Sequence, residues 1–431
     1  MSSTEITRVR AWEALDSRGR PTVACRIDLD GGAHAVARVP SGASTGSHEV
    51  AELRDGGTRY EGAGVRNAVA AVIDHVGPAV IGLDAESTAQ VDRAIAAVEQ
   101  EREPGTVGAN ATLAVSLAAV IAAANAQDAP LARMLHPVGP LQLPMPMVNI
   151  VSGGAHAAGA LDIQDVLVIP EGASTFAEAI EWVAMVRAAA TRIALDRGFA
   201  EAALVADEGG LGLRLGSNVA ALELVAEAVE TSGLDLGTDV TIAIDAAATE
   251  FYADGAYTLA RDGRILDAER LLAMYSDWVD RFPIRSIEDP LAEDDWDGWA
   301  LATRELGGRI DLVGDDLFVT QADRLKRGVA EHSATAILVK VNQNGLVSRA
   351  GDVLRTARDA GFRTIVSARS GETEDSWVAD LATGWAAGQL KVGSTHRSER
   401  TAKWNRVLEL EATEESTLAH PWPRRSKEES A

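Results

Sequence analysis

Short apolar runs that each end in a charged residue constrain the fold of this chain more than any other feature. The clearest of them end at Asp245, Glu288, Asp315 and Lys340. Intervals of roughly 25–45 residues between these ends are typical of strand-plus-helix units in a parallel sheet or barrel. Parallel strands bring their carboxyl ends to one face, so we expect these four side chains to meet there.

Three carboxylates that meet at one face repel one another unless a cation lies between them. Ligands that offer only oxygen favour a hard divalent ion, above all Mg²⁺. Lys340 would stand next to that ion, and an amine in this position could act as a base. The pattern therefore predicts a metal-dependent enzyme site.

Lysine is rare in this chain, which draws attention to the lysines that remain. Only five of the 40 basic residues are lysine, and the other 35 are arginine. Arginine does not release its proton in a protein, whereas lysine can when burial or a neighbouring cation lowers its pKa. Lys340 and Lys391 each lie in an apolar run, so we expect each to be needed for this proton chemistry or for its compact ammonium group.

Composition excludes several classes of function. The net charge of −24 on 431 residues disfavours nucleic acid and anionic membranes as partners, but it leaves room for a small anionic substrate. A lone Cys25 excludes an internal disulfide and suits a reducing compartment. The first residues carry no secretory pattern, and the apolar segment 111–125 is too short to span a membrane. We therefore expect a cytoplasmic protein.

Two domains are expected, an α+β domain over 1–136 and a barrel over 137–431, because four prolines between Pro137 and Pro146 indicate a junction. In the first domain, residues 5–39 alternate as strands do around a hairpin signal at 30–32. Helical spacing follows at 64–77, 86–102 and 109–127.

In the second part apolar runs recur and alternate with helical stretches such as 218–230, 267–281 and 345–360. The runs lie at 145–151, 163–169, 203–207, 241–245, 284–288, 311–315, 335–340, 363–367 and 387–392. This α/β alternation predicts a modified (β/α)8 barrel, and a doubly wound open sheet is the alternative.

Longer motifs carry a family resemblance. In chain order they are ALDSRGRPTV (14–23), PSGASTG (40–46), ELRDG (52–56), GANATLAVSLA (108–118), DEGG (207–210), SIEDP (286–290), GDDL (314–317), KVNQ (340–343) and RSGETED (369–375). Together they resemble enolase. The resemblance implies a smaller α+β domain on a modified TIM barrel, two Mg²⁺ ions per site and a homodimer.

The resemblance also implies roles for single residues. Asp245, Glu288 and Asp315 match the ligands of the first Mg²⁺, and Ser44 matches a ligand of the second, substrate-borne one. The catalytic set comprises the base Lys340, the acid Glu208, its partner Asp165 and the loop histidine His156. The substrate-binding set comprises Arg369 and Ser370 for phosphate, Lys391 for the carboxylate, Gln164 and Ser44. We expect neighbouring carboxylates to raise the pKa of Glu208, and bound cations to lower that of Lys340.

Several residues depart from the family pattern near the site. Asp165 stands where the family has Glu, Ala368 where it has His, Ser152 and Gln321 where it has Asn, and Gly212-Leu213-Arg214 where it has Ala-Pro-Asn. These changes shorten an acid, remove an imidazole and add a guanidinium, which we expect to lie near the mouth of the site. A larger, more anionic substrate would benefit from this combination.

Three functions therefore stay open. The first is the glycolytic dehydration of 2-phosphoglycerate to phosphoenolpyruvate. The second is a paralogue in phosphonate natural-product biosynthesis, similar to carboxyphosphonoenolpyruvate synthase, which joins a nucleotide-activated phosphonoformate to a three-carbon enol unit. The third is a catalytically silent binding or scaffold protein, against which the intact Lys340 and acidic triad argue.

Overall fold

A closed eight-stranded barrel forms the larger part of the molecule. The computed structural model describes residues 3–42, 46–103 and 105–423. The barrel strands are β5 (Met145–Ser152), β6 (Asp165–Ile169), β7 (Thr241–Asp245), β11 (Ile284–Glu288), β12 (Asp311–Gly314), β13 (Ala336–Val339), β14 (Arg363–Ser367) and β15 (Gln389–Gly393). They close in this order, with β15 next to β5. The predicted barrel is confirmed, and the open-sheet alternative is wrong.

One strand, β6, runs against its neighbours. It pairs antiparallel with both β5 and β7, whereas the other barrel pairs are parallel. A strand that is reversed in this way brings its first residue to the face where the other strands end. Asp165, the first residue of β6, accordingly lies opposite Ser152 and Asp245, the last residues of β5 and β7.

Helices surround the barrel. They are α6 (Phe176–Asp196), α7 (Val219–Thr231), α8 (Ala268–Arg281), α9 (Trp296–Leu306), α10 (Ala322–Glu331), α11 (Val341–Asn344), α12 (Val347–Asp359), α13 (Trp377–Gly384) and α14 (Ser398–Thr413). With helices on its outer face, a strand such as β7 is buried along its whole length, which explains runs that are apolar rather than alternating. Side-chain caps from Thr175, Asp267 and Asp295 begin α6, α8 and α9.

The first domain is a three-stranded antiparallel meander that packs against a buried helix. Its strands are β1 (Ile6–Leu15), β2 (Pro21–Leu29) and β3 (His34–Arg38), and the predicted hairpin joins β2 to β3. Its helices are α1 (Arg66–Ala71), α2 (Gly77–Val80), α3 (Thr88–Glu101), α4 (Ala109–Ala126) and α5 (Leu131–Leu135). Helix α4 is longer than the apolar segment 111–125 and is long enough to cross a membrane, but 83% of it is buried inside the protein, against the sheet and neighbouring helices, as in a core helix.

Small elements complete the fold. Strand β4 (Leu141–Leu143) pairs with β16 (Ser416–Leu418), and β8 (Tyr252–Ala253), β9 (Ala256–Leu259) and β10 (Arg264–Leu266) form a separate small sheet. Short 3-10 turns lie at Arg59–Gly62, Gly154–Ala157, Ala200–Ala203 and Ala248–Phe251.

Two expectations about these elements are wrong. The run 203–207 is not a strand: a 3-10 turn ends at Ala203, and Leu204 and Val205 are 70% and 43% exposed, so this apolar run has no sheet to join. The expected helix over 64–77 is divided, because a π-helical turn at Val72–Val76 separates α1 from α2.

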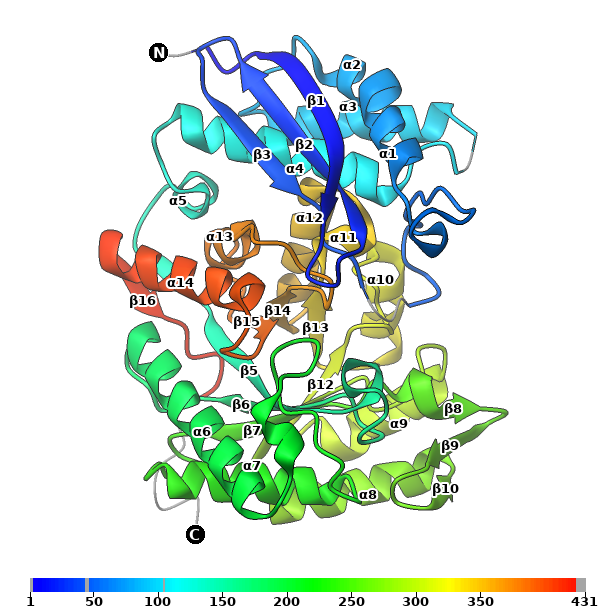
Figure 1. Ribbon diagram of the computed structural model, residues 1–431, viewed down its shortest axis with the longest axis vertical. Coiled ribbons are helices and arrows are strands. Elements are labelled where there is room, and N and C mark those ends of the chain that lie inside the picture. Colours follow the sequence, from blue (N-terminus) through cyan, green and yellow to red (C-terminus); the bar gives the residue numbers. More distant parts are fainter. Residues whose placement is uncertain (1–2, 43–45, 104, 424–431) are drawn as a thin grey trace.

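The first domain lies against the barrel at the end where the parallel strands finish (Figure 1). Main-chain hydrogen bonds join Ser41 to Gly371 in both directions, and Arg38 forms an ion pair with Asp375 at 2.6 Å. These contacts hold the first domain over the carboxyl face of the barrel.

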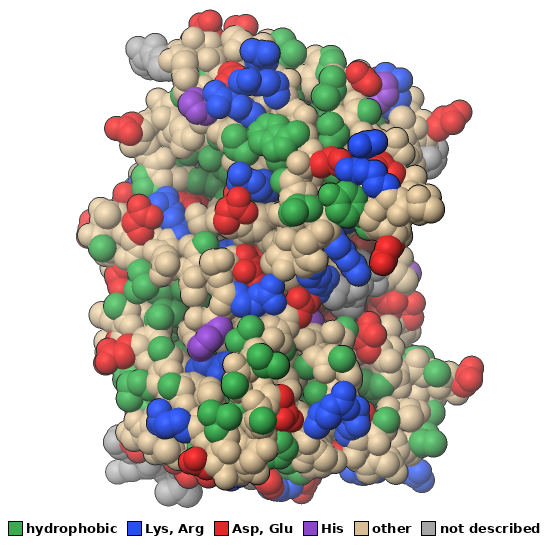
Figure 2. Space-filling model, in the orientation of Figure 1, with side chains coloured by type: hydrophobic (Ala, Val, Ile, Leu, Met, Phe, Trp, Pro, Cys, Tyr) green, Lys and Arg blue, Asp and Glu red, His purple; other side chains and the backbone are tan. Residues whose placement is uncertain are grey.

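The surface of the molecule carries mixed charge. On the face shown in Figure 2, acidic and basic side chains are interspersed.

Candidate active site

A small cavity lies at the carboxyl ends of the barrel strands, beneath the first domain. Its lining residues are His156, Gln164, Glu208, Asp245, Lys340, Ser367, Ala368, Arg369, Ser370, Lys391 and Val392. Most of the predicted catalytic and substrate-binding side chains are thus brought together, although they come from segments up to about 235 residues apart in the chain. The sequence prediction of one shared face is correct.

The three predicted metal ligands end neighbouring strands. Asp245 and Glu288 are in register at the ends of β7 and β11, and Asp315 directly follows β12. All three are buried. The Nζ atom of Lys391 lies 2.7 Å from a carboxylate oxygen of both Asp245 and Glu288, and Lys340 forms an ion pair with Asp315.

These acids create a strong demand for positive charge. Burial and the charges of Asp245 and Asp315 raise the pKa of Glu288 well above its usual range. Ammonium groups from Lys340 and Lys391 meet part of that demand. An oxygen-only set of carboxylates suits a hard divalent cation, so the residues fit the metal that the sequence predicts.

The carboxylates nearest to one another are not the predicted triad. Among the described residues, oxygens of Asp289, Asp315 and Asp316 lie within 4.8 Å of one another, and the predicted triad is not such a group. The ammonium group of Lys391 contacts both Asp245 and Glu288, the first two members of that triad. Asp289 is already engaged, because it accepts the backbone N–H groups of Asp315 at 3.0 Å and Asp316 at 2.8 Å.

Acidic and cationic groups alternate around His156, next to the acidic triad. His156 Nδ1 lies 2.9 Å from Asp165 Oδ2, and His156 Nε2 lies 3.7 Å from Glu208 Oε1. Burial works against charge on this imidazole, but Asp165 and Glu208 outweigh it and raise the pKa of His156 to about 9. The histidine is therefore a cation at neutral pH.

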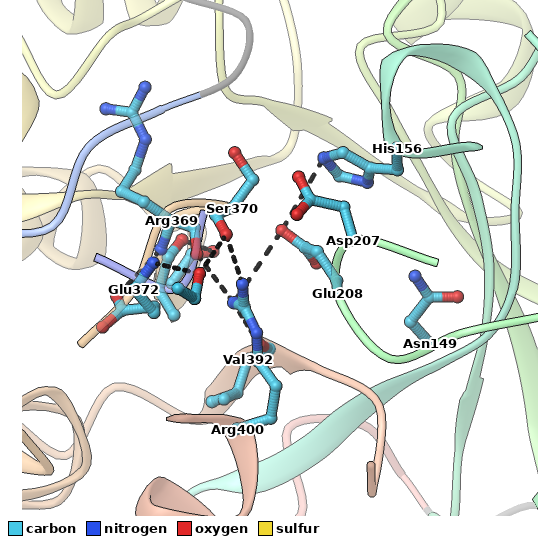
Figure 3. A network of polar contacts seen from close by, with 12 residues as sticks. Asn149, His156, Asp207, Glu208, Arg369, Ser370, Glu372, Val392 and Arg400 are labelled. Atoms are coloured by element: carbon cyan, nitrogen blue, oxygen red, sulfur yellow. Dashed lines mark hydrogen bonds and ion pairs between the residues drawn. The ribbon is translucent and has the colours of Figure 1, made fainter. Parts of the chain in front are cut away.

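Glu208 has cations rather than carboxylates around it. Arg400, which is fully buried, approaches it to 4.0 Å and donates to the carbonyl oxygens of Arg369 and Val392 (Figure 3). Burial raises the pKa of Glu208, but His156 and Arg400 outweigh burial and lower it. The expectation that neighbouring carboxylates raise this pKa is wrong, because the side chains that reach Glu208 carry positive charge.

Lys340 directly follows β13, where Thr320 Oγ1 accepts its backbone N–H at 2.9 Å. Burial opposes its charge, but the adjacent Asp315 dominates and raises the pKa of Lys340. A lysine in this state is an acid rather than a base. The predicted lowering of the Lys340 pKa by bound cations concerns the site with metal ions bound.

Arg369 is held from both domains. Its guanidinium forms a two-pronged contact with Glu49, at 3.0 and 3.1 Å, and donates to Asn342 Oδ1 at 2.9 Å. Next to it, Ser370 lines the cavity, and its carbonyl oxygen accepts from Arg400. Gln164 donates to Asp245 Oδ2 at 3.1 Å. The predicted ligand Ser44 lies outside the described residues.

Comparison with protein families matches both parts of the chain. Residues 6–135 match the family described as enolase, N-terminal domain, and residues 140–420 match enolase, C-terminal TIM barrel domain. The chain belongs to the enolase family. It is accordingly an enzyme of the enolase superfamily and a lyase.

Two departures from the usual enolase residues compensate each other. Ser152 and Asp165 face each other across β5 and β6, and the serine hydroxyl donates to the carboxylate at 3.0 Å. Asn149 donates to the same carboxylate oxygen. The shorter acid thus keeps a full set of donors and still reaches His156.

The remaining enolase departures divide between the cavity and its surroundings. Ala368 lines the cavity. Gln321 donates to the carbonyl oxygen of Gln343 at 3.0 Å, away from the cavity wall. Leu213 is buried, whereas Arg214 is exposed and does not line the cavity. The expected place of the Arg214 guanidinium near the mouth of the site stays a prediction.

Several site residues escaped the sequence analysis. Glu49, Arg400 and Gln343 each touch a predicted residue, and Arg18 of the first domain binds Asp207, next to Glu208, at 2.8 Å. Gln343 and Arg18 lie inside the motifs KVNQ and ALDSRGRPTV, so the sequence could have indicated them. Arg400 lies in no such motif, and nothing in the sequence distinguishes it as a buried residue among 35 arginines.

Proposed function

We propose that this enolase-family enzyme catalyses the reversible dehydration of 2-phosphoglycerate to phosphoenolpyruvate. The observation that carries the proposal is the cavity itself. Lys340 and Glu208 both line it, together with Arg369 and Lys391, so a small anion held there would have a base and an acid within reach. This is the arrangement that removal of a proton and of a β-hydroxyl requires.

Lys340 is proposed as the base that removes the proton next to the substrate carboxylate. It must be neutral to do so, and Asp315 now keeps it protonated. Magnesium held by Asp245, Glu288 and Asp315 would compensate these carboxylates and stabilise the negative charge of the enolate. A lysine or histidine base paired with magnesium is the general pattern of enolase-superfamily sites, and the residues present here agree with it.

Glu208 is proposed as the acid that protonates the departing hydroxyl. An acid with a lowered pKa needs a proton supply close by, and His156 Nε2 lies 3.7 Å from its carboxylate. His156 is protonated at neutral pH and is held by Asp165, so its proton can pass to Glu208 as Glu208 gives its own proton to the departing hydroxyl. The hydroxyl is then the final acceptor, and His156 takes up a proton again from solvent.

Substrate binding is proposed to use the cations of the cavity wall. Arg369 and Ser370 would hold the phosphate, since a planar guanidinium suits an oxyanion. Lys391 and Gln164 would hold the carboxylate end, and Ser44 would bind the substrate-borne Mg²⁺. A cytoplasmic homodimer that binds neither nucleic acid nor membranes completes the proposal, and light scattering in solution tests the dimer.

The decisive experiment is a turnover assay with 2-phosphoglycerate and Mg²⁺, followed by the appearance of phosphoenolpyruvate. Lys340→Ala, purified in the same way, is the matched control and should be inactive. A wild-type protein without turnover, in a preparation that binds Mg²⁺, would overturn the proposal.

A second candidate keeps the same enolate chemistry but uses a larger substrate, as in phosphonate natural-product biosynthesis. Ala368 favours it, because a methyl group lines the cavity where the family has an imidazole, and the smaller side chain leaves more room. Phosphorus NMR of the protein with a nucleotide-activated phosphonoformate and a three-carbon enol donor tests this candidate. A new carbon-bound phosphorus signal would support it.

A further inference from the structure

Glu49 is the acidic partner of the candidate phosphate-binding arginine. Its two carboxylate oxygens accept from Arg369 Nη1 at 3.0 Å and Nη2 at 3.1 Å. The two side chains are 11% and 3% exposed, so this ion pair lies in a poorly hydrated place. An ion pair of this kind is strong, because two parallel hydrogen bonds fix its geometry.

The carboxylate of Glu49 is itself held on three sides. Its Oε1 accepts the backbone N–H of Gly46 at 3.1 Å and lies 3.4 Å from Gln343 Nε2. The same Gln343 amide donates to Asp315 Oδ1 at 3.0 Å. One buried amide thus links Glu49 to a predicted metal ligand, and the position of Glu49 is fixed by both domains.

Glu49 also decides the charge that an incoming anion meets. Burial opposes the charge of Arg369, but Glu49 more than compensates and raises the pKa of that guanidinium. With Glu49 in place, the pair is neutral overall, and a phosphate dianion gains little by approaching it. A buried guanidinium without that partner would attract the same dianion strongly.

We propose that Glu49 is a specificity-determining residue, an internal anion that occupies Arg369 and makes the site reject free inorganic phosphate. The inference rests on the proposed function, in which Arg369 binds the phosphate of the substrate. A true substrate overcomes the competition because its carboxylate binds elsewhere in the cavity, whereas inorganic phosphate has no second anchor.

Two substitutions separate charge from shape. Glu49→Gln keeps the size of the side chain and removes its charge, whereas Glu49→Asp keeps the charge and shortens the reach. Inorganic phosphate is titrated into the metal-free, full-length proteins by calorimetry. We expect Glu49→Gln to bind phosphate at least tenfold more tightly than the wild type, and Glu49→Asp to stay within threefold of the wild type. Glu49→Ala removes the same charge and replaces Glu49→Gln if that variant does not fold.

Kinetics give an independent readout. With 2-phosphoglycerate, Glu49→Gln should lower both KM and kcat, because the ground state gains a guanidinium that no longer pairs with a carboxylate, while Arg369 loses part of its orientation. A merely structural residue would lower kcat alike in both variants without tightening phosphate. Equal phosphate affinity in wild type and Glu49→Gln would overturn the inference.

Arg369→Gln, made in the Glu49→Gln background, separates the inference from the proposed function. Loss of the gained phosphate affinity supports both. Gained affinity that survives the removal of Arg369 would show that phosphate binds elsewhere, and the phosphate role of Arg369 in the proposed function would fail. Gained affinity that is absent from the start fails the inference alone.

Discussion

Asp165 and Asp245 face each other across β6 and β7, although one begins its strand and the other ends its own. The reversal of β6 produces this register. It places an acid of the His156 wall directly beside an acid of the proposed metal site. The two halves of the proposed chemistry therefore share one rigid pair of strands.

Substitution of the acidic triad should abolish tight Mg²⁺ binding. We expect Asp245→Asn, Glu288→Gln and Asp315→Asn each to weaken binding at least tenfold, about 1.4 kcal/mol, because each removes a charged oxygen ligand. Calorimetric titration with MgCl₂ measures this. Asp277→Asn on α8 removes an exposed acid and serves as the control. Wild-type affinity in all three variants would refute the assignment.

Lys340 and Glu208 should separate two halves of the reaction. Lys340→Ala should stop exchange of the substrate α-proton with deuterated solvent, because no other base takes its place. Glu208→Gln should keep exchange but lose elimination. Proton NMR follows both, and Lys326→Ala, at an exposed lysine, should behave as wild type. Exchange at the wild-type rate in Lys340→Ala would mean that another residue is the base.

His156 should make stability depend on pH. Its folded-state pKa is raised from 6.5 to about 9, so its stabilisation is fully present below pH 6.5 and is lost as the pH rises through 9. The size of this loss is on the order of 3 kcal/mol. The urea midpoint of the wild type should fall across this range, and that of His156→Gln should fall less. His34→Gln, on the exposed end of β3, should follow the wild type.

Ala368 should distinguish the two candidate functions. If 2-phosphoglycerate is the natural substrate, Ala368→His should change kcat/KM for it by less than tenfold, about 1.4 kcal/mol in barrier. A gain of more than tenfold would instead favour a site adapted to a larger anion. Ala368→Val fills the same space without an imidazole and separates packing from chemistry. Steady-state assays of the three proteins supply the comparison.

The recurring apolar runs of the sequence predict most barrel strands, whereas features that depend on one long-range contact are not visible in the sequence. The run ending at Asp245 predicts its strand to the residue, because a strand buried on both faces must be apolar throughout. The run at 203–207 looks the same but is exposed, since apolar character alone does not reveal whether a neighbouring strand exists. Arg400, one of the cations beside Glu208, was missed because it reaches the site from α14, and no local sequence pattern encodes a contact over that separation.

The reversal of β6 has a consequence for how this enzyme family can change. After strands such as β11, β12 and β14, the loop at the active face leads into a covering helix, so altering the length of that loop displaces a helix. Residues 153–164, which carry His156, instead join two directly paired strands as a hairpin loop. Because no α-helix lies between β5 and β6, insertions or deletions in this loop need not shift any helix that covers the barrel. This loop is the part of the site that evolution or protein engineering can lengthen, shorten or replace at the least cost to folding.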